Sequence, residues 1–504
     1  MEVNVMNWSV PHISFPKWLL PYGFKTGAAE SSSKTESNHN DMDLISQLSD
    51  DLLILIVGRL PTKDAVRTSI LSNRWRSIYK FAPDVDLKSE YLVGTSPCCI
   101  VTFLTALERF LKLRSGCKIR CLNLTCYFIK SDACQHAKFI LKLEELLLGI
   151  ESLSLHYSTA SSDRLFPCLI ISKIPSLTYL SLEYCTLLRA FDHVLTQSNS
   201  LQVLRLVGVT VRTGALECIL ANCLSLHSLS MDICEIGSKL IIRGPNLKLK
   251  SLCVRGCIDL EEIELYASNL ATFEFESLDM VNIRFEHVPE LESMFLDCEN
   301  VTTMSNVCKN LVRVLPHMKS LIFGTKGDIY QVIISEVICS RSMGINTFSN
   351  LTQLSMHLES TKGVNLLSLV LFLESCPLLQ EFHLNTELVE YNDWKHTTRL
   401  TAVIQELKKV EITGYSGTKP EIEFALYILK SAIDLEQMQI IRCSKQYNGR
   451  GSWSGGDEPP WNKRTSKMIH RQLQNQAISQ NARLIIQHSP VSLNCRSLLN
   501  IVDN

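Results

Sequence analysis

The sequence lacks an excess of charge of either sign, because its 50 Lys and Arg residues balance 51 Asp and Glu residues. Such a balance gives no electrostatic reason to expect nucleic acid as a partner. Long apolar runs are also missing: stretches such as 52–57 and 369–373 fall far short of the roughly 20 residues that span a membrane. Residues 1–20 lack the charged region and unbroken apolar stretch of a secretory signal. We therefore expect no nucleic-acid partner and no membrane partner.

The 19 cysteines lack the even number and close spacing of a disulfide-stapled secreted domain, so we expect a reducing compartment, the nucleus, the cytoplasm or both. The densest group of metal-ligand residue types consists of Cys117, Cys121, Cys126, Cys134 and His136. A zinc site needs a regular ligand spacing, and this group contains no C-x-x-C pair. We interpret these cysteines as structural and expect no metal and no cofactor.

Recognisable catalytic motifs are absent as well. The sequence contains no G-x-S-x-G elbow, phosphate-binding glycine loop or H-E-x-x-H helix, and its 13 histidines are scattered. A hydrolase or transferase whose site is assembled from distant residues is the remaining enzymatic alternative. The repeats described below usually present a broad binding surface rather than a closed reaction pocket, so we expect that the chain is not an enzyme.

What the sequence does contain is enough apolar material to fold. Apolar residues make up 46% and charged residues 20% of the 504 residues, which can offset the entropy of ordering most of the chain. This length suits two or three domains or one extended repeat array. Residues 25–42 are rich in Ser, Asn, Lys and Glu without apolar periodicity, so we expect segment 1–42 to be disordered.

A repeated pattern, apolar-x-x-apolar-x-apolar, dominates the sequence from residue 119 onward. Its last two apolar positions are spaced as one face of a short strand requires, and successive copies begin 21 to 33 residues apart. This period is typical of leucine-rich repeats, whose stacked units bury faces that one unit cannot. We assign residues 100–400 to a leucine-rich-repeat solenoid. The copies are Ile119-Leu122-Leu124, Ile150-Leu153-Leu155, Leu177-Leu180-Leu182, Leu201-Leu204-Leu206, Leu226-Leu229-Met231, Leu249-Leu252-Val254, Leu270-Phe273-Phe275, Leu291-Met294-Leu296, Met318-Leu321-Phe323, Leu351-Leu354-Met356, Leu379-Phe382-Leu384, Leu407-Val410-Ile412 and Leu435-Met438-Ile440.

A cysteine follows the last apolar position of several copies by three residues, at Cys185, Cys234, Cys257 and Cys443. Leucine-rich repeats carry Asn or Cys at this position, where a small side chain faces inward and helps the turning backbone to fill its hydrogen bonds. Neighbouring strands lie side by side, so we expect Cys234 and Cys257 to be close without a disulfide.

The positions between the buried residues of each copy face solvent. In such an array they are the candidates for substrate recognition, and we name Tyr179, Arg205 and His227 among them. Their chemistry is mixed and does not identify a substrate.

Residues 43–88 predict a small helical module. Apolar residues step by four from Leu44 to Leu60, Pro61 ends this helix, Thr62 can cap the next helix, and Ser72 or Asn73 can cap a third. On periodicity alone, the stripe from Leu44 to Leu60 could equally be an internal helix contact.

The segment 45–80 resembles a plant-type F-box. The matching elements are DDLL at 50–53 with Ile56, LPTKDAV at 60–66, and LS-x-RWR at 71–76. In that family the module docks on a Skp-type adaptor, which joins a cullin scaffold and its RING subunit. The resemblance implies that Trp75 is an internal anchor. It also implies an adaptor interface that draws on the following residues, some of which can instead fill the module's own core: Leu48, Ser49, Leu52, Leu53, Ile56, Leu60, Pro61 and Val66.

One position departs from the resemblance, since the family usually has Leu-Pro where this chain has Leu48-Ser49. Loss of the proline removes a rigid contact and a preset helix start. Ser49 can still act as an N-cap, so we expect docking to be weakened rather than abolished.

The C-terminal part resembles the FBD domain that follows leucine-rich repeats in many plant F-box proteins, on the segments 376–384 and 407–443. We expect 401–443 to form modified terminal repeats that act as a cap, in the order strand, loop, helix, strand. Residues 444–504 are expected to be a tail: a Gly, Ser and Pro-rich loop over 444–464, then a polar helix over 466–487. Trp453 and Trp461 are expected to pack against the cap rather than to anchor a partner.

The expected fold is α/β: a small all-α F-box module, then a leucine-rich-repeat solenoid with a parallel β-sheet horseshoe, then an FBD-like cap. The favoured function is a substrate receptor of an SCF-type cullin-RING ubiquitin ligase, with an unidentified protein substrate on the repeat face. The alternative is a leucine-rich-repeat scaffold or small-molecule sensor whose F-box no longer engages a ligase.

Overall fold

The structure of the chain is a computed structural model, and it divides into two compact units. Unit 1 consists of Met1–Leu201 with Gly208–Thr210, and unit 2 consists of Gln202–Val207 with Val211–Asn504. No helix in the described part of the chain is long and apolar enough to cross a membrane. The segment 1–42, expected to be disordered, lies outside the described residues. The structure describes 44–94, 98–114, 117–128, 133–146, 149–157, 164–189, 200–244, 247–314, 317–326, 332–336, 348–360, 366–388, 403–449 and 451–489.

Unit 1 begins with short helices, α1 (Asp50–Val57), α2 (Thr62–Arg67) and α3 (Asn73–Ile78), with single 3-10 turns at Thr68–Ile70 and Tyr79–Phe81. Side-chain caps start α1 and α3, since Ser49 accepts a hydrogen bond from the amide of Leu52 and Ser72 accepts one from the amide of Trp75. Asp50 and Asp51 in the first turn of α1 match the helix dipole. The core of this helical module is made by buried residues from all three helices: Leu53, Val57, Ala65, Val66, Trp75 and Ile78.

A parallel sheet follows in unit 1, in the order β1 (Asp84–Lys88), β2 (Cys121–Cys126), β3 (Ser152–Tyr157) and β5 (Tyr179–Glu183). The strand pairing places equivalent apolar positions side by side, for example Leu124 opposite Leu155 and Leu155 opposite Leu182. Strand β1, with Leu87 opposite Leu124, precedes the first predicted copy. The connecting elements are α4 (Ser89–Val93), α5 (Ile100–Leu113), α6 (Ala133–Leu146), β4 (Leu165–Pro167), α7 (Leu169–Lys173) and β6 (Thr186–Leu188).

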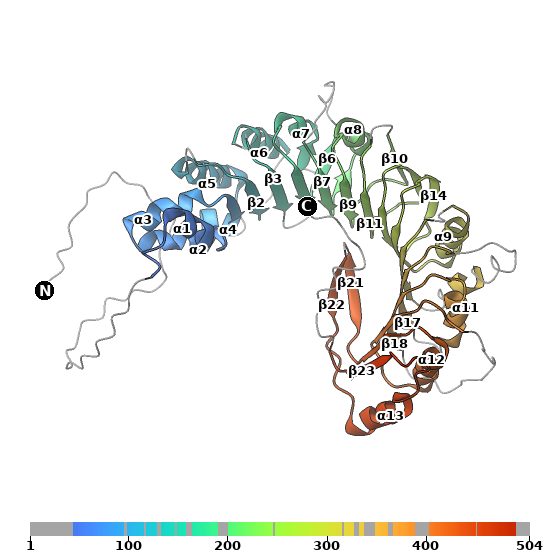
Figure 1. Cartoon of the computed structure of the whole chain (residues 1–504). Coiled ribbons are helices and arrows are strands. Elements are labelled where there is room, and N and C mark those ends of the chain that lie inside the picture. Colours follow the sequence, from blue (N-terminus) through green and yellow to red (C-terminus); the bar gives the residue numbers. More distant parts are fainter. Residues whose placement is uncertain are drawn as a thin grey trace, which may run out of the picture. The chain divides into compact units, whose positions relative to one another are not determined.

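Unit 2 continues the repeat pattern with parallel strands in one sheet. In Figure 1 its helices lie along one side of these strands, which we call the outer side. The strands are β7 (Val203–Val207), β9 (Ser228–Asp232), β11 (Ser251–Arg255), β13 (Thr272–Ser277), β15 (Ser293–Cys298), β16 (Ser320–Lys326), β17 (Gln353–Ser360), β18 (Glu381–Leu388), β19 (Lys409–Thr413), β20 (Gln437–Ile441) and β23 (Arg483–Gln487). The outer elements are α8 (Ala215–Asn222), β10 (Lys239–Arg243), β12 (Glu262–Tyr266), β14 (Asn282–His287), α9 (Val301–Val314), a 3-10 turn at Leu366–Ser368, α11 (Leu369–Leu373) and α12 (Lys419–Ser431).

Each of the thirteen predicted copies of the repeat forms a strand, and the last two apolar residues of every copy are buried. At Cys234 and Cys257, the predicted Asn/Cys position has the expected role. The thiol of Cys234 lies 3.4 Å from the carbonyl of Asp232, and that of Cys257 lies 3.6 Å from the carbonyl of Met231, so both thiols donate to turning backbone. The FBD-like region has the predicted order of strand, loop, helix and strand in β19, α12 and β20.

The structure differs from the expected loop and helix after residue 443. A hairpin, β21 (Lys445–Gly449) and β22 (Ser452–Gly455), forms within the Gly and Ser-rich stretch. Helix α13 covers only Lys463–Leu473, and the rest of the expected helix contains β23, which pairs with β20. Strand β23 was not predicted because its copy of the repeat has Asn481 at the first of the three apolar positions.

Candidate functional site

The helical module of unit 1 leaves one face of α1 apolar and exposed. Leu52, Leu55 and Ile56 are 48%, 64% and 45% exposed, and their spacing places them on the same side of the helix. Leu53 and Val57 are fully buried on the opposite side. We call Leu52, Leu55 and Ile56 the α1 apolar face. Nearby in the sequence, the module exposes further large apolar side chains: Leu44, Ile45, Leu60, Ile70, Leu71 and Phe81.

The structure divides the predicted adaptor-binding residues into two groups. Leu52, Ile56, Leu60 and Pro61 are exposed, and Leu48 is half-buried. Leu53 and Val66, at 0% and 4% exposure, fill the module's own core. Leu55 was not among the predicted residues, although it is the most exposed of the large apolar side chains on α1. Its position three residues after Leu52 was the signal that could have identified it.

Ser49 has the geometry of an N-cap. Its φ of −64° and ψ of 157° are outside the helix, and its hydroxyl accepts a hydrogen bond of 3.5 Å from the amide of Leu52. The expectation that serine can start this helix is confirmed. The distance is long, so the bond contributes little.

We expect Ser49→Pro to raise the affinity for a Skp-type adaptor about threefold, because the φ of −64° already matches the proline ring and the substitution removes freedom from the unbound segment. Titration of full-length variants against the adaptor measures this. Ser49→Ala, which removes the cap without adding rigidity, should give no gain. Equal affinities for the proline variant and the wild type would contradict the expected effect.

Arg74 of α3 fixes the chain as it enters α1. Its guanidinium donates to the carboxylate of Asp50 over 2.7 Å, to the carbonyl of Ser46 over 2.6 Å and to the carbonyl of Leu48. One side chain thereby holds three points of the segment that leads to the α1 apolar face.

We expect Arg74→Ala to lower adaptor affinity about tenfold, because hydrogen bonds from a charged group contribute roughly 1.5 kcal/mol or more and the entry segment would lose its anchor. Amide hydrogen exchange of residues 46–52 in the same variant should become faster. Arg76→Ala removes an exposed arginine from the same helix and is the matched control. Unchanged exchange in the Arg74 variant would show that the guanidinium does not hold this segment.

The side of the unit 2 sheet opposite its helices, the inner face, carries a row of aligned side chains. Strand pairing places Glu274 next to Phe295, Phe295 next to Ile322, and Ile322 next to Ser355. The row continues to His383. It runs across the strands and combines apolar with ionisable groups.

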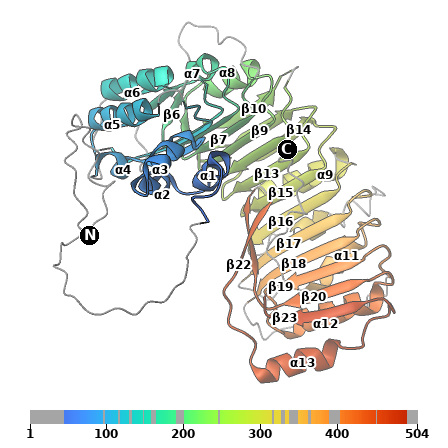
Figure 2. The ribbon, with the colours of Figure 1, turned by 60° about the vertical axis from the view of Figure 1, so that its left-hand side comes forward.

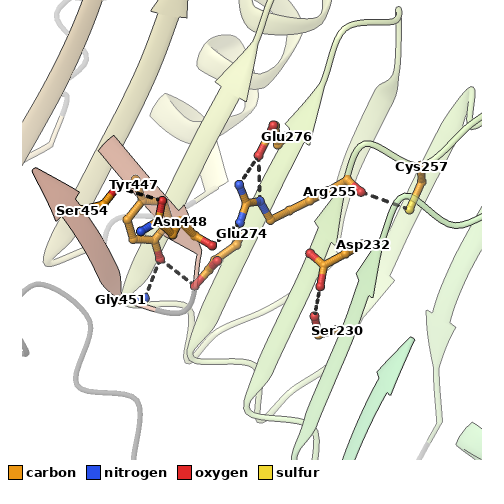
Figure 3. A network of polar contacts seen from close by, with 10 residues as sticks. All are labelled: Ser230, Asp232, Arg255, Cys257, Glu274, Glu276, Tyr447, Asn448, Gly451 and Ser454. Carbon is orange, nitrogen blue, oxygen red and sulfur yellow. Dashed lines mark hydrogen bonds and ion pairs between the residues drawn. The ribbon is translucent and has the colours of Figure 1, made fainter. Parts of the chain in front are cut away.

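The hairpin β21–β22 covers this row. The ring of Tyr447 lies 4.3 Å from that of Phe295, and the phenol donates a hydrogen bond of 2.8 Å to the carboxylate of Glu274 (Figure 3). Trp453 stacks on His357 at 4.9 Å between ring centres. As a result Glu274, Phe295 and Ile322 are no more than 2% exposed on a face that would otherwise meet solvent.

Polar contacts fix the hairpin at both ends. At its base, the amide of Lys445 donates to Asn385 over 2.9 Å, and the Lys445 ammonium pairs with Glu411. Near its tip, the Arg255 guanidinium donates to the carbonyl of Asn448 over 2.6 Å. The figures agree on its placement, since Figure 2 also draws the hairpin in front of β15 and β16.

Ionisable side chains beneath the hairpin shift one another's pKa values. His383 lies 3.6 Å from Glu411 and 3.9 Å from Glu381, and these carboxylates raise its pKa against the opposing effect of burial. The nearby His383 ring and the Lys409 ammonium lower the pKa of Glu381 to about 2. Burial opposes ionisation of Glu411, but His383 and Lys445 outweigh it and lower its pKa to about 2. Burial, followed by the charges of His383 and Lys445, lowers the pKa of His357 to about 3, so its ring stays neutral.

A cleft of about 440 Å³ remains beside the hairpin. It is lined by β21 on one side and by residues of β11, β13, β15, β16, β17 and β18 on the other. We call it the hairpin groove. Its exposed lining is mainly polar, which distinguishes it from a closed apolar pocket for a small molecule.

The predicted substrate-binding residues lie elsewhere. Tyr179 begins β5 in unit 1, while Arg205 is central in β7 and His227 directly precedes β9 in unit 2. All three are half-buried. Sequence reasoning missed the hairpin groove, because Tyr447 and Glu274 are 173 residues apart and no local pattern connects them.

The Cys and His group considered as a zinc site is dispersed in the structure. His136 is buried and its Nε2 lies 2.8 Å from the hydroxyl of Tyr157. Cys126 is fully buried, and burial raises the pKa of its thiol. The side chain of Cys134 lies outside the described residues. Among the residues that the structure describes, no group of three or more His, Cys, Asp or Glu side chains could hold a metal ion.

The two tryptophans of the C-terminal stretch both pack against the protein. The indole of Trp461 donates a hydrogen bond of 2.8 Å to the carbonyl of Tyr415 in the FBD-like region, as expected. Trp453 packs on the inner face through His357 and Tyr447 instead.

Comparison with known proteins matches two family models. The model described as At1g61320/AtMIF1, LRR domain matches residues 110–487, and that described as F-box domain matches residues 45–78. Similar proteins of Arabidopsis thaliana include F-box/FBD/LRR-repeat protein At5g56420, 25% identical over 78% of this chain and 90% of the relative. FBD-associated F-box protein At5g60610 is 24% identical over 79% and 100%, and FBD-associated F-box protein At1g61320 is 22% identical over 80% and 90%.

Proposed function

Because this chain belongs to the F-box and leucine-rich-repeat family of the At1g61320/AtMIF1 type, we propose that it is the substrate-recognition subunit of an SCF-type cullin-RING ubiquitin ligase. The helical module docks on a Skp-type adaptor, and the repeat sheet binds a protein substrate. Ubiquitin is transferred by the other subunits, so the chain itself performs no chemistry. We place this assembly in the nucleus or the cytoplasm.

The α1 apolar face is the single observation that carries the proposal. A module of this size gains nothing from three large apolar side chains in water, whereas their burial in a partner's groove contributes roughly 1.5–3 kcal/mol each. Their spacing on one helix fits the way in which a helix lies in a groove of a partner. Arg74 holds the start of this helix through its hydrogen bonds to Ser46, Leu48 and Asp50, so the face is formed before the adaptor binds.

The scaffold or sensor alternative depends on a degenerate F-box or on a closed apolar pocket. Ser49, the one departure, retains the helix start. The hairpin groove is polar and open, so it does not favour a small apolar ligand. Both features support the ligase proposal over this alternative.

Co-purification of the full chain with a Skp-type adaptor tests the proposal. We expect one copy of each protein to elute together in size-exclusion chromatography, and we expect the pair to associate with a cullin. Failure of the wild-type chain to form the adaptor complex would favour the scaffold alternative.

A further inference from the structure

The hairpin groove has a fixed shape, because the hairpin β21–β22 is held against the sheet by specific contacts. Tyr447 is 7% exposed, its hydroxyl donates to Glu274, and the amide of Gly451 donates to the same hydroxyl over 2.8 Å. Gly449, with a φ of 91°, lies against the Arg255 side chain, whose guanidinium donates to the neighbouring carbonyl of Asn448. Displacement of the hairpin would break these contacts and expose Phe295, so the hairpin is a wall of the groove.

The dimensions of the groove fit an extended chain. Its lining crosses six adjacent strands, from β11 to β18, and five strand spacings of about 4.8 Å make roughly 24 Å. An extended peptide rises roughly 3.3 Å per residue, so about seven residues span this length. A compact small molecule would fill only part of it.

Among the described lining residues, the carboxylates of Glu276, Asp297 and Glu359 outnumber the cations of Arg255 and Lys445. Arg255 and Lys445 line the groove, but Glu276 and Glu411 form ion pairs with them. Asp297 and Glu359 are further carboxylates in the lining. The negative lining complements a positively charged side chain.

Gly324 lets Asp297 reach over the floor of the groove. Strand pairing places the two residues side by side, and a Cβ on Gly324 would lie 2.5 Å from Cγ of Asp297. Any other residue at this position would push the Asp297 side chain away. Because Gly324 has no side chain, the groove stays open at this point and the Asp297 carboxylate can keep its position.

We propose that the hairpin groove binds an extended segment of the substrate polypeptide, about seven residues long, with a lysine or arginine side chain directed at the exposed carboxylate of Glu359. This rests on the proposed function and names the class of substrate for it. The groove, and not Tyr179, Arg205 or His227, then makes the main contacts with that segment.

Selection of peptides by the purified full chain tests the groove. The probe is a displayed library of random nine-residue peptides, and we expect enrichment of Lys or Arg at one position. For an enriched peptide, Glu359→Lys should weaken binding at least tenfold. Glu217→Lys makes the same charge change at an exposed position of α8 and should leave the peptide affinity within twofold of the wild type. Replacement of residues 445–455 by a Gly-Ser linker should abolish binding, because it removes one wall.

Three results would overturn the groove proposal: no enrichment, enrichment without basic residues, or equal losses in the Glu359 and Glu217 variants. Tighter peptide binding after removal of the hairpin would show that it is a plug instead of a wall. Adaptor capture is measured separately on the same variants. If the wild-type chain captures the adaptor but selects no peptide, only the groove proposal is wrong. If the wild-type chain does not capture the adaptor, the ligase proposal is wrong.

Discussion

Substitution of both Leu52 and Ile56 by alanine should reduce binding to a Skp-type adaptor more than 100-fold without unfolding the chain. Each side chain is about half-exposed in the free protein, so its truncation opens no cavity in the core. At a buried interface the same two truncations remove roughly 3 kcal/mol or more, which corresponds to this loss of affinity. Isothermal titration of the full-length variant against the adaptor measures the effect.

Two controls separate docking from folding. Ile258→Ala truncates a side chain of unit 2 that is 52% exposed, and it should leave adaptor binding unchanged. Leu53→Ala truncates a fully buried neighbour and should instead destabilise the helical module by about 2–5 kcal/mol. Wild-type affinity in the double variant would mean that the adaptor contacts another surface.

The repeat strands could be predicted from the sequence because each one places two apolar residues in the core at a fixed spacing. Leu229 and Met231 illustrate this, since both are fully buried and both occur in the pattern. The buried alternate positions of β21 are Lys445, Tyr447 and Gly449, whose burial depends on Glu411, Glu274 and Arg255. A strand that is buried through polar contacts with distant residues leaves no periodic signal.

The α1 apolar face could be predicted only in part from the sequence, for a related reason. A wide apolar stripe on one helix predicts burial, but it does not say whether the burial is within the module or against a partner. Leu53 and Leu52 are adjacent and chemically identical, yet Leu53 is buried in the module, where α3 and the turn Tyr79–Phe81 pack on α1, and Leu52 is 48% exposed. Three short helices cannot enclose all of the apolar residues from Leu44 to Leu60, and the surplus forms the α1 apolar face.

Tyr447→Ala should detach the hairpin from the inner face while the repeat sheet stays folded. The substitution removes a ring packed on Phe295 and a buried hydrogen bond to Glu274, a combined loss of about 3 kcal/mol or more. Amide exchange in β21 and β22 should accelerate roughly 100-fold, since every 1.4 kcal/mol changes an equilibrium tenfold. Exchange in β7 and β9, which do not line the hairpin groove, should change little.

Graded variants resolve the two contributions of Tyr447. Tyr447→Phe keeps the ring on Phe295 and loses only the hydroxyl, so protection of β21 should fall by about 1–2 kcal/mol. Gln446→Ala, an exposed position on the same strand, should have no measurable effect. If the alanine variant retained full protection, the hairpin would be held by its other contacts: the Lys445 pair with Glu411, the Arg255 bond to Asn448 and the Trp453 stack on His357. Glu411→Gln would then measure what the ion pair at the base contributes.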